Sequence, residues 1–412
     1  MSDVNFHKGY KSTDIGVIPE DWKVNNLSEI AEIIMGQSPT GSSYNKKETG
    51  IALINGPTEF TENHPIKIQW TTSPTKLCKS GDVLLCIRGS STGRMNIAND
   101  TYCIGRGITA IRARENSDNL FLEFMVQNAV KNLLALSAGS TFPNLDSKSL
   151  RKIEIVSPPL PEQKAIARVL SDVDELIREC DSLLAKKRNI KQGTMQQLLT
   201  GKKRLPGFSG EWEVKKLGDI FDFKNGLNKE KKYFGEGTPI VNYMDVYKNN
   251  ALTAKDILGR VTVSKNELKT YEVCRDDVFF TRTSETVDEI GIASVIIEEL
   301  ENTVFSGFIL RARPKNNLLN TFYKKYCFSS QNLRKAITSK SSYTTRALTN
   351  GRILSNVEIF LPTLCEQKAI AQILSDMDAE IEGLEKKRDK YKAIKQGMMQ
   401  ELLTGKTRLI NN

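Results

Sequence analysis

An internal duplication constrains this chain more than any other feature of its sequence. Residues 162–205 match residues 366–409 without a gap, and about 25 of the 44 aligned positions are identical. The tripeptides Ile153-Glu-Ile and Val357-Glu-Ile precede the two copies at the same distance. Self-similarity at a fixed interval indicates that one structural arrangement is used twice.

Weaker similarities flank the repeat and place a lobe before each copy. The segment DWKVNNLSEIAEI from Asp21 resembles EWEVKKLGDIFDF from Glu211, and GDVLL from Gly81 resembles DDVFF from Asp276. Between these shared pieces the two lobes differ almost completely. We therefore expect one fold that carries two different working surfaces.

Each copy of the repeat has the pattern of a long helix, because apolar residues recur at intervals of three and four. Prolines at positions 158, 159 and 161 mark the start of the first helix, and Thr363 as N-cap with Glu366 three residues later marks the start of the second. Gly201 and Gly405 follow the last apolar residues and predict C-terminal stops. Each helix should span roughly 39 residues, or about 58 Å.

The apolar period near 3.5 predicts that the two helices pack against each other as a coiled coil. A glycine costs a helix about 1 kcal/mol relative to alanine, so the two glycines inside the helices favour a close helix crossing at their level. The residues expected in the packing interface are Val169, Val173, Leu176, Ile190, Gly193, Ile373, Met377, Ile381, Ile394 and Gly397.

The order of the parts predicts a topology. The first helix leaves lobe one and ends just before lobe two begins, and the second, an equal repeat, should return to lobe one. Two equal helices that run in opposite directions between equivalent lobes form an antiparallel pair with an approximate two-fold axis. The two ends of the chain should then meet near lobe one.

Each lobe has the pattern of an α+β domain, with short apolar segments bounded by Gly, Asn, Ser and Pro. Strands are expected from Val83, Ile108, Val278 and Phe308, and helices over 121–136 and 321–337. The predicted fold is two pseudo-two-fold-related α+β domains separated by an antiparallel coiled coil of two long helices. The expected boundaries are 1–157 for the first domain, 158–203 for the central helix, 204–361 for the second domain and 362–412 for the C-terminal helix.

Composition indicates a globular protein with a polyanionic partner. The chain has 412 residues, enough for two domains, with 39% hydrophobic and 26% charged residues. Its formal charge of +10 favours a nucleic acid, because lysine and arginine placed against phosphates release condensed counterions. The first residues are polar and no apolar run is long enough to cross a bilayer, so we expect a cytoplasmic location.

The sequence has few residues that could form a metal site, a disulfide framework or a cofactor site. The seven cysteines form no Cys-x-x-Cys pair, and His7 and His64 are the only histidines. A histidine-ligated metal or a Ser-His-Asp relay is therefore not expected, and no cofactor is predicted.

Enzymatic motifs are also missing. An adenine methyltransferase motif requires Asn or Asp before two prolines and an aromatic residue after them, whereas this chain reads Ser157-Pro-Pro-Leu160. No phosphate-binding loop of the G-x-x-x-x-G-K-[ST] type is present. Scattered Glu-x-Lys triplets are expected by chance in so charged a chain, which makes a nuclease the weakest alternative.

The repeated motif resembles that of a known family. Pro158-Pro-Leu-Pro-Glu-Gln-Lys-Ala-Ile-Ala, followed by a long helix that ends in Gln-Leu-Leu-Thr-Gly-Lys, occurs twice and alternates with lobes that open with Trp22 and Trp212. Over nearly the whole chain this resembles the specificity (S) subunit of Type I restriction-modification systems. The second copy departs from the first at Thr363-Leu-Cys365, where proline is tolerated but not required.

The resemblance implies a role in DNA recognition without a catalytic site. Each lobe would be a target recognition domain that reads one half of a split, asymmetric site in double-stranded DNA. The helices would set the spacing of the half-sites and dock two adenine methyltransferase (M) subunits, and restriction/translocase (R) subunits would join through the methyltransferases. No membrane partner is implied.

Base contacts require polar side chains on the loops of the lobes. The candidates in lobe one are Gln37, Ser38, Thr40, Ser42, Tyr44, Arg88, Ser90, Arg94, Ser140 and Thr141. The candidates in lobe two are Lys224, Asn225, Lys229, Arg282, Thr283, Ser284, Lys340, Ser341 and Tyr343. For each residue taken singly, a solvated loop position is the alternative.

Two further alternatives stay open at this stage. The basic clusters at 186–188, 202–204 and 386–388 could follow a DNA path, although a solvated helix face is the more usual explanation. The chain could also be a standalone bipartite DNA-binding protein, or a coiled-coil scaffold without a DNA role. Salt-dependent binding to duplex DNA would argue against the scaffold.

Overall fold

The computed structural model describes residues 9–62, 64–136, 145–343 and 346–410. The chain divides into two compact units, unit 1 with residues 1–181 and 386–412 and unit 2 with residues 182–385. Helices α4 (Leu160–Leu198) and α11 (Leu364–Leu402) are the predicted long helices, each of 39 residues, and each contributes one part to each unit. In the structure each half of a long helix therefore belongs to the unit that it contacts. The boundaries expected from the sequence instead set the helices apart from the two domains.

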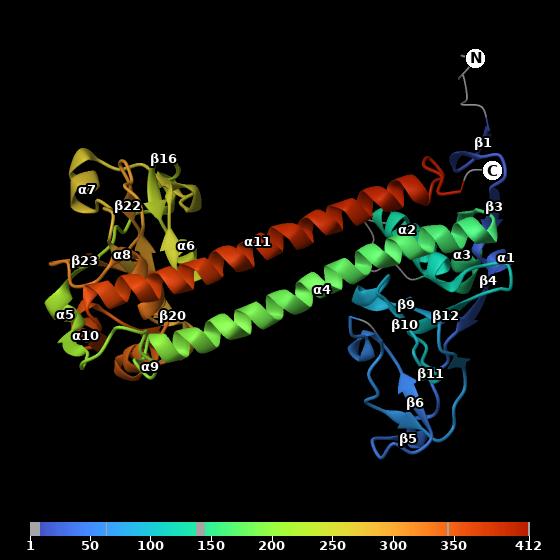
Figure 1. The fold of residues 1–412 in the computed structure, drawn as a ribbon, viewed down its shortest axis with the longest axis horizontal. Helices are drawn as coiled ribbons and strands as arrows, with labels where there is room; N and C mark the ends of the chain where they lie inside the picture. The colour runs from blue at the N-terminus through green and yellow to red at the C-terminus, as the bar shows by residue number, and fades with distance from the viewer. Residues whose placement is uncertain (1–8, 63, 137–144, 344–345, 411–412) are drawn as a thin grey trace, which may run out of the picture. The chain divides into compact units, whose positions relative to one another are not determined.

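Unit 1 is an α+β domain in which many short strands are combined with a few helices (Figure 1). Its strands are β1 (Tyr10–Thr13), β2 (Gly16–Pro19), β3 (Lys23–Asn26), β4 (Ala31–Met35), β5 (Tyr44–Asn45), β6 (Ile51–Ile54), β7 (Trp70–Thr71), β8 (Leu77–Cys78), β9 (Val83–Cys86), β10 (Met95–Ile97), β11 (Tyr102–Ile104), β12 (Ile108–Ala113) and β13 (Glu154–Ser157). Its shorter helices are α1 (Leu27–Ile30), α2 (Asn119–Leu136) and α3 (Ser147–Arg151).

Two sheets form the body of unit 1, an antiparallel sheet in the order β10-β9-β12-β4 and a mixed sheet in the order β5-β7-β6-β11-β8. Strand β9 lies between two cores, because successive side chains of a strand point to opposite faces. Val83 and Leu85 belong to the core that includes α2, whereas Leu84 and Cys86 belong to the core of the second sheet. This explains why all four residues of the strand are buried.

Unit 2 is built in the same way. Its strands are β14 (Glu213–Lys216), β15 (Phe221–Asn225), β16 (Phe234–Val241), β17 (Ala251–Leu252), β18 (Arg260–Val261), β19 (Val278–Thr281), β20 (Thr283–Ser284), β21 (Ala293–Ile296), β22 (Val304–Phe305), β23 (Ile309–Pro314), β24 (Ser342–Tyr343), β25 (Ala347–Leu348) and β26 (Glu358–Leu361). Its shorter helices are α5 (Leu217–Ile220), α6 (Tyr243–Lys248), α7 (Lys265–Thr270), α8 (Thr321–Cys327), α9 (Gln331–Lys340) and α10 (Gly351–Ser355).

The sheets of unit 2 repeat the framework of unit 1. The sheet β15-β23-β19-β21-β17 corresponds to β4-β12-β9-β10, and the parallel pair of β16 and β22 corresponds to that of β6 and β11. In both units the strand that enters the domain pairs with the strand just before the long helix, as β3 does with β13 and β14 with β26. The predicted repetition of one α+β fold is therefore confirmed.

A buried carboxylate at the start of each long helix joins three segments of its own unit. In unit 1 Glu162, whose side chain is 2% exposed, accepts hydrogen bonds from Trp22 Nε1 at 3.0 Å and from Arg408 at 2.7 and 2.8 Å. In unit 2 Glu366 accepts equivalent bonds from Trp212 at 3.3 Å and from Arg204 at 2.6 and 2.7 Å. We call these clusters the Trp–Glu–Arg junctions.

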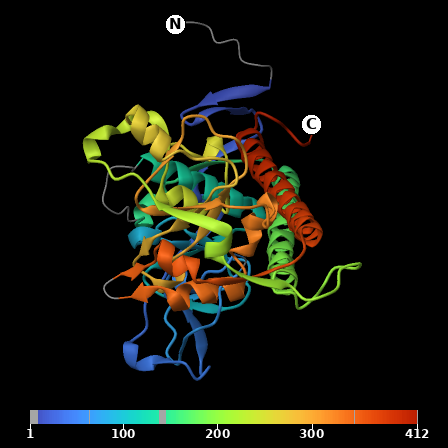
Figure 2. The same cartoon turned by 90° about the vertical axis from the view of Figure 1, so that its left-hand side faces the viewer.

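The junction of unit 1 brings the C-terminal segment onto the N-terminal strands. Arg408 also binds Asp21 through two hydrogen bonds, and Tyr10 donates a hydrogen bond to the carbonyl oxygen of Gly405. Figure 2 shows the β1–β2 hairpin beside the end of α11. Hydrogen bonding to Glu162 raises the pKa of Arg408 further above its usual range. The predicted meeting of the two chain ends at the first lobe is thus confirmed within unit 1.

Within each unit the segments of α4 and α11 run antiparallel and are joined by ion pairs. In unit 1 Lys395 binds Asp174 at 2.7 Å and Arg388 binds Asp181 at 3.4 Å, so the residue numbers rise on one helix as they fall on the other. In unit 2 the two helices are joined by the ion pairs Lys187–Glu380, Arg188–Glu385 and Lys191–Asp378.

The apolar packing predicted for the helix pair is partly wrong. Leu176, Ile190 and Ile394 are 40%, 44% and 40% exposed, so these three residues do not form a buried interface in the chain. A Cβ placed on Gly193 or Gly397 would meet no atom within 4 Å, so neither glycine marks a close helix crossing. The other predicted positions, Val169, Val173, Ile373, Met377 and Ile381, are half-buried, whereas Cys180 and Leu184 are buried.

This open space leads to a prediction about stability. Replacing Gly193 or Gly397 with alanine should raise the free energy of unfolding by up to about 1 kcal/mol, because alanine restricts the unfolded chain and nothing obstructs its methyl group. Urea unfolding of the full chain would measure the change. A loss of stability in either variant would show that the glycine is required for a contact after all.

Candidate nucleic-acid interface

The lobe-one candidates lie on two loops that leave neighbouring strands at the same edge of one sheet. Strand β4 ends at Met35 and leads to residues 36–44, and β9 ends at Cys86 and leads to residues 88–94. Strand β12 lies between β4 and β9, and the N–H of Gly36 donates to the carbonyl oxygen of Ile108 at 2.9 Å. The structure therefore brings the two predicted loops together.

Glycine is required at the start of the first loop. A Cβ on Gly36 would lie 2.1 Å from the carbonyl oxygen of Gly105, and a Cβ on Gly226 of unit 2 would lie 2.2 Å from that of Ser306. Both contacts are with backbone atoms, which cannot move aside as a side chain can. The two units therefore hold the first loop against the sheet by the same close approach.

Some of the lobe-one candidates use their side chains in hydrogen bonds within unit 1, and others do not. Ser38 accepts a hydrogen bond from the N–H of Arg106, Tyr44 donates to the carbonyl oxygen of Pro39, and Arg94 donates to that of Phe60. These three support the loops. Ser140 and Thr141 lie outside the described residues. The exposed candidates without such a side-chain bond are Gln37, Thr40, Ser42, Arg88 and Ser90.

In unit 2 the candidates gather at the corresponding edge. Strand β15 ends at Asn225, β19 is followed by Arg282, and β23 lies between them. The small sheet β20-β25-β24 then joins Thr283 and Ser284 to the backbone of Ser342 and Tyr343, through β25. Three segments that are distant in the sequence thus meet at one edge of unit 2.

Several lobe-two candidates are engaged within their own unit. Lys224 donates to the carbonyl oxygen of Thr270, and Lys340 donates to that of Asn356. Lys229 pairs with Glu267 at 2.9 Å, and hydrogen bonds from Ser264 and this lysine lower the pKa of Glu267 to about 2. Ser284 donates to Glu289 and Ser341 to the carbonyl oxygen of Ile337. The candidates left with exposed or weakly bound polar groups are Asn225, Arg282 and Thr283.

Two exposed residues at these edges were not predicted from the sequence. Arg106 lies in the turn between β11 and β12, where its backbone N–H binds Ser38, and the residue is exposed. Phe308 precedes β23 in unit 2 and is 66% exposed beside Arg282, whose N–H donates to its carbonyl oxygen at 3.4 Å. The flanking glycines at 105, 107 and 307 were the available signal, because they hold these turns against the strands.

The basic clusters on the helices are partly used inside the protein. Lys187, Arg188, Arg204 and Arg388 each form an ion pair with an acidic residue of their own unit. This outcome favours a structural role for these four residues over a continuous basic path along the helices.

Two kinds of feature are absent from the described residues, a metal-binding cluster and a membrane-spanning helix. No group of three or more His, Cys, Asp or Glu side chains is placed to hold a metal ion. Among the helices that the structure describes, none combines the length and the apolar character that a membrane span requires.

Comparison with solved structures shows the same fold. A chain solved in work on complex assembly and conformational transition of the type I R-M system aligns with a TM-score of 0.62 at 18% identity, over 95% of this chain and 99% of that one. The Type-I restriction-modification system S subunit from M. genitalium aligns with a TM-score of 0.55 at 15% identity, over 93% and 96% of the two chains.

Comparison of sequences identifies relatives and a family. The type I restriction enzyme MjaX specificity subunit of Methanocaldococcus jannaschii is 38% identical over 202 residues, which is about half of each chain, 48% of this one and 47% of the relative. The MjaVIII specificity subunit of the same organism is 24% identical over 96% of this chain and 95% of its own length. The family model for the Type I restriction modification DNA specificity domain matches residues 19–186 and again residues 209–393. The chain therefore belongs to this family and contains the domain twice.

Proposed function

We propose that this chain is the DNA sequence-recognition subunit of a Type I restriction-modification complex, in which each domain reads one half of a split, asymmetric site. The observation that carries the proposal is the pair of equivalent sheet edges. Each edge is held by the same backbone framework, yet one presents Gln37, Arg88 and Arg106 and the other Asn225, Arg282 and Phe308. Different side chains on one framework are what two unlike half-sites require.

The chemistry of these side chains suits base readout. Arginine can bind guanine through two hydrogen bonds, and asparagine or glutamine can bind adenine in the same way. An exposed phenylalanine beside such an arginine can contact a thymine methyl group or a base step. Lysines bound to their own unit, as Lys224 and Lys229 are, contribute less to the DNA contact.

We also propose that the subunit has no catalytic site of its own and works with partners. Two adenine methyltransferase subunits would dock on the long helices, and restriction/translocase subunits would join through them in the cytoplasm. Exposed apolar residues on the helices support docking, because such residues are otherwise turned inward. They are Leu176 and Ile394 in unit 1, and Leu183, Ile190 and Leu364 in unit 2.

A domain exchange tests the proposed function. Residues 30–150 would be replaced by the corresponding segment of a relative with a different specificity, and methylated adenines would be mapped in DNA from a host that expresses the complex. We expect the first half-site to change to that of the donor and the second to stay the same. The reciprocal exchange of the second domain is the matched control. An unchanged first half-site would contradict the assignment of unit 1.

A further inference from the structure

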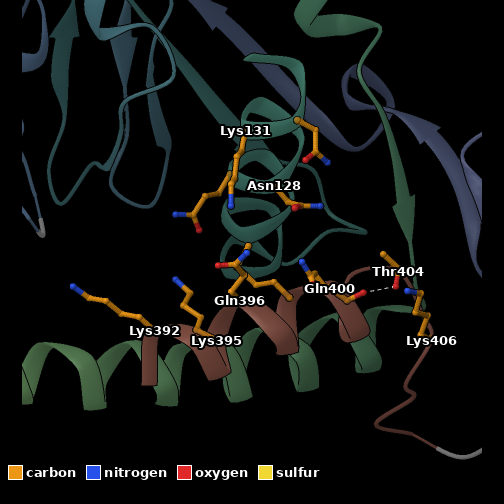
Figure 3. A pocket seen from close by; sticks show the side chains of 11 residues that line it. Asn128, Lys131, Lys392, Lys395, Gln396, Gln400, Thr404 and Lys406 are labelled. Atoms are coloured by element: carbon orange, nitrogen blue, oxygen red, sulfur yellow. Dashed lines mark hydrogen bonds between the residues drawn. The ribbon is translucent and has the colours of Figure 1, made fainter. Parts of the chain in front are cut away.

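A basic groove in unit 1 is not part of the sheet edges described above. Helix α2 and the C-terminal part of α11 border a groove of about 430 Å³, and Lys131, Lys392, Lys395 and Lys406 line it together with several amide side chains. Figure 3 shows Lys131 pointing from α2 towards α11, and Lys395 and Gln396 pointing from α11 towards α2, whereas Lys392 extends sideways from α11. No Asp or Glu is among the lining residues.

Three of the four lysines have no acidic partner in the described structure. Lys395 donates to Asp174 at 2.7 Å and lies over the ring of Phe124 at 5.0 Å, so its charge serves the fold of unit 1. Lys131, Lys392 and Lys406 are exposed, and their ammonium groups make no ion pair among the described residues. Three like charges thus face one groove without compensation, which favours an anionic ligand.

This groove is a property of unit 1 and not of the repeat. The repeat places Arg188 at the position equivalent to Lys392, and Arg188 is paired with Glu385 in unit 2. The corresponding face of α8 and α9 forms a smaller cavity of about 160 Å³ lined by Tyr323, Cys327 and Leu333 among others. The groove of unit 1 therefore differs from unit 2 in its size and in the free charge at Lys392, whereas Lys202, the equivalent of Lys406, is also exposed.

The side chains of the groove suit phosphates better than a protein surface. Protein interfaces rely on aromatic and aliphatic anchors and are depleted in lysine, whereas Met399 is the one such apolar side chain in the groove lining. Lysine, asparagine and glutamine are among the side chains that most often contact DNA phosphates. From Lys392 to the end of α11 at Leu402 the helix rises about 15 Å, which is the axial length of about four base pairs.

We propose that this groove binds the phosphodiester backbone of duplex DNA, through Lys131, Lys392 and Lys406. The inference rests on the proposed function and adds to it a sequence-independent contact made by unit 1 alone. Such a contact strengthens binding to every sequence equally, because phosphates carry no base identity.

The test measures the salt dependence of DNA binding by the full chain. A labelled duplex of random sequence would be titrated between about 50 and 300 mM KCl with the wild type and with the Lys131→Ala/Lys392→Ala/Lys406→Ala variant. The slope of log K against log salt should become shallower by about 2 to 3, since each lost phosphate contact removes roughly 0.9. The ratio of specific to random affinity should not change.

A charge-matched control separates the groove from the loss of net charge. Lys148, Lys164 and Lys390 are exposed lysines of unit 1 outside the groove, and their replacement by alanine should leave the slope unchanged. A wild-type slope in the groove variant would overturn the proposal, as would equal effects in both triple variants. If the groove variant keeps its slope but no longer binds the methyltransferase subunit, the groove is a protein site and the proposal is wrong.

The wild type tests the proposed function separately. Selection from a pool of random duplexes should enrich a bipartite sequence. Enrichment together with an unchanged slope in the groove variant would refute the groove and leave the function standing. Failure of the wild type to enrich any sequence would refute the function itself.

Discussion

Replacing Glu162 with alanine should destabilise unit 1 by about 3 kcal/mol while unit 2 stays folded. The change removes the acceptor of Trp22 Nε1 and of Arg408, and it leaves a donor of the fully buried Trp22 without a partner. Breaking one side of a buried ion pair costs about 3–5 kcal/mol, and the partial exposure of Arg408 places this pair at the lower end. Hydrogen exchange of peptides from each unit would locate the loss, and urea unfolding would measure it.

Because the chain contains the junction twice, the equivalent change in unit 2 serves as a control for Glu162→Ala. Glu366→Ala should weaken unit 2 in place of unit 1, and by less, because Trp212 is half-buried whereas Trp22 is fully buried. Removing residues 406–412 deletes Arg408 and should weaken unit 1, and combining this truncation with Glu162→Ala should cost less than the sum of the two. Glu175→Ala, on an exposed part of α4, should have little effect. Equal loss of protection in both units after Glu162→Ala would contradict the local role of the junction.

Lengthening both long helices by four residues should change the spacing between the two half-sites by about two base pairs. Insertions between Asp181 and Ser182 and between Glu385 and Lys386 lie at the boundaries of the two units, so ion pairs within a unit, such as Arg388–Asp181 and Arg188–Glu385, are kept. Four residues add about 6 Å to a helix, and DNA rises 3.4 Å per base pair. Methylation mapping would report the new spacing together with both half-sites.

The control for this experiment keeps the helices at their natural length. Replacing the exposed residues Glu179, Ser182 and Lys390 with alanine alters the same region without an insertion and should leave the recognised site unchanged. If the insertion variant methylates a site with the original spacing, the helices do not set that spacing. If the half-sites themselves change, the insertions have altered the domains.

Elements with strong local patterns could be predicted from the sequence. The long helices, the strand Ile108–Ala113 and the helical stops at Gly201 and Gly405, both with positive φ near +70°, follow from spacing and residue type. The helix predicted over 321–337 is two helices, α8 and α9. Ser330 ends the continuity, because its side chain accepts a hydrogen bond from the N–H of Leu333 and caps a new helix.

Contacts between distant segments could not be predicted in the same way. Glu162 and Glu366 have the position of ordinary first-turn acids, and local pattern does not reveal that Arg408 and Arg204 bind them. One signal was present, because the identity of the repeat continues past each helix stop to Arg204-Leu205 and Arg408-Leu409. Helix formation does not require identity beyond the last turn. Identical residues after the end of the helix therefore indicate a tertiary contact.

In the candidate interface, too, the local features could be predicted from the sequence and the long-range contacts could not. Glycine-flanked polar loops were recognisable, and the sheets bring them together at one edge of each unit. The sequence could not show that Lys224 and Lys229 bind their own unit, because their partners Thr270 and Glu267 are about 40 residues away. The exposure of Leu176, Ile190 and Ile394 was missed because a period of 3.5 identifies an apolar stripe but not the surface that covers it.

The position of Arg408 also determines the order in which the protein can be completed on the ribosome. Unit 2 is formed by the continuous stretch 182–385, and Arg204, Trp212 and Glu366 of its junction all lie within that stretch. Unit 1 also needs the segment 386–412, which is made after unit 2. The domain whose synthesis begins first is therefore the one completed second, and its core around Trp22 waits for that segment to emerge.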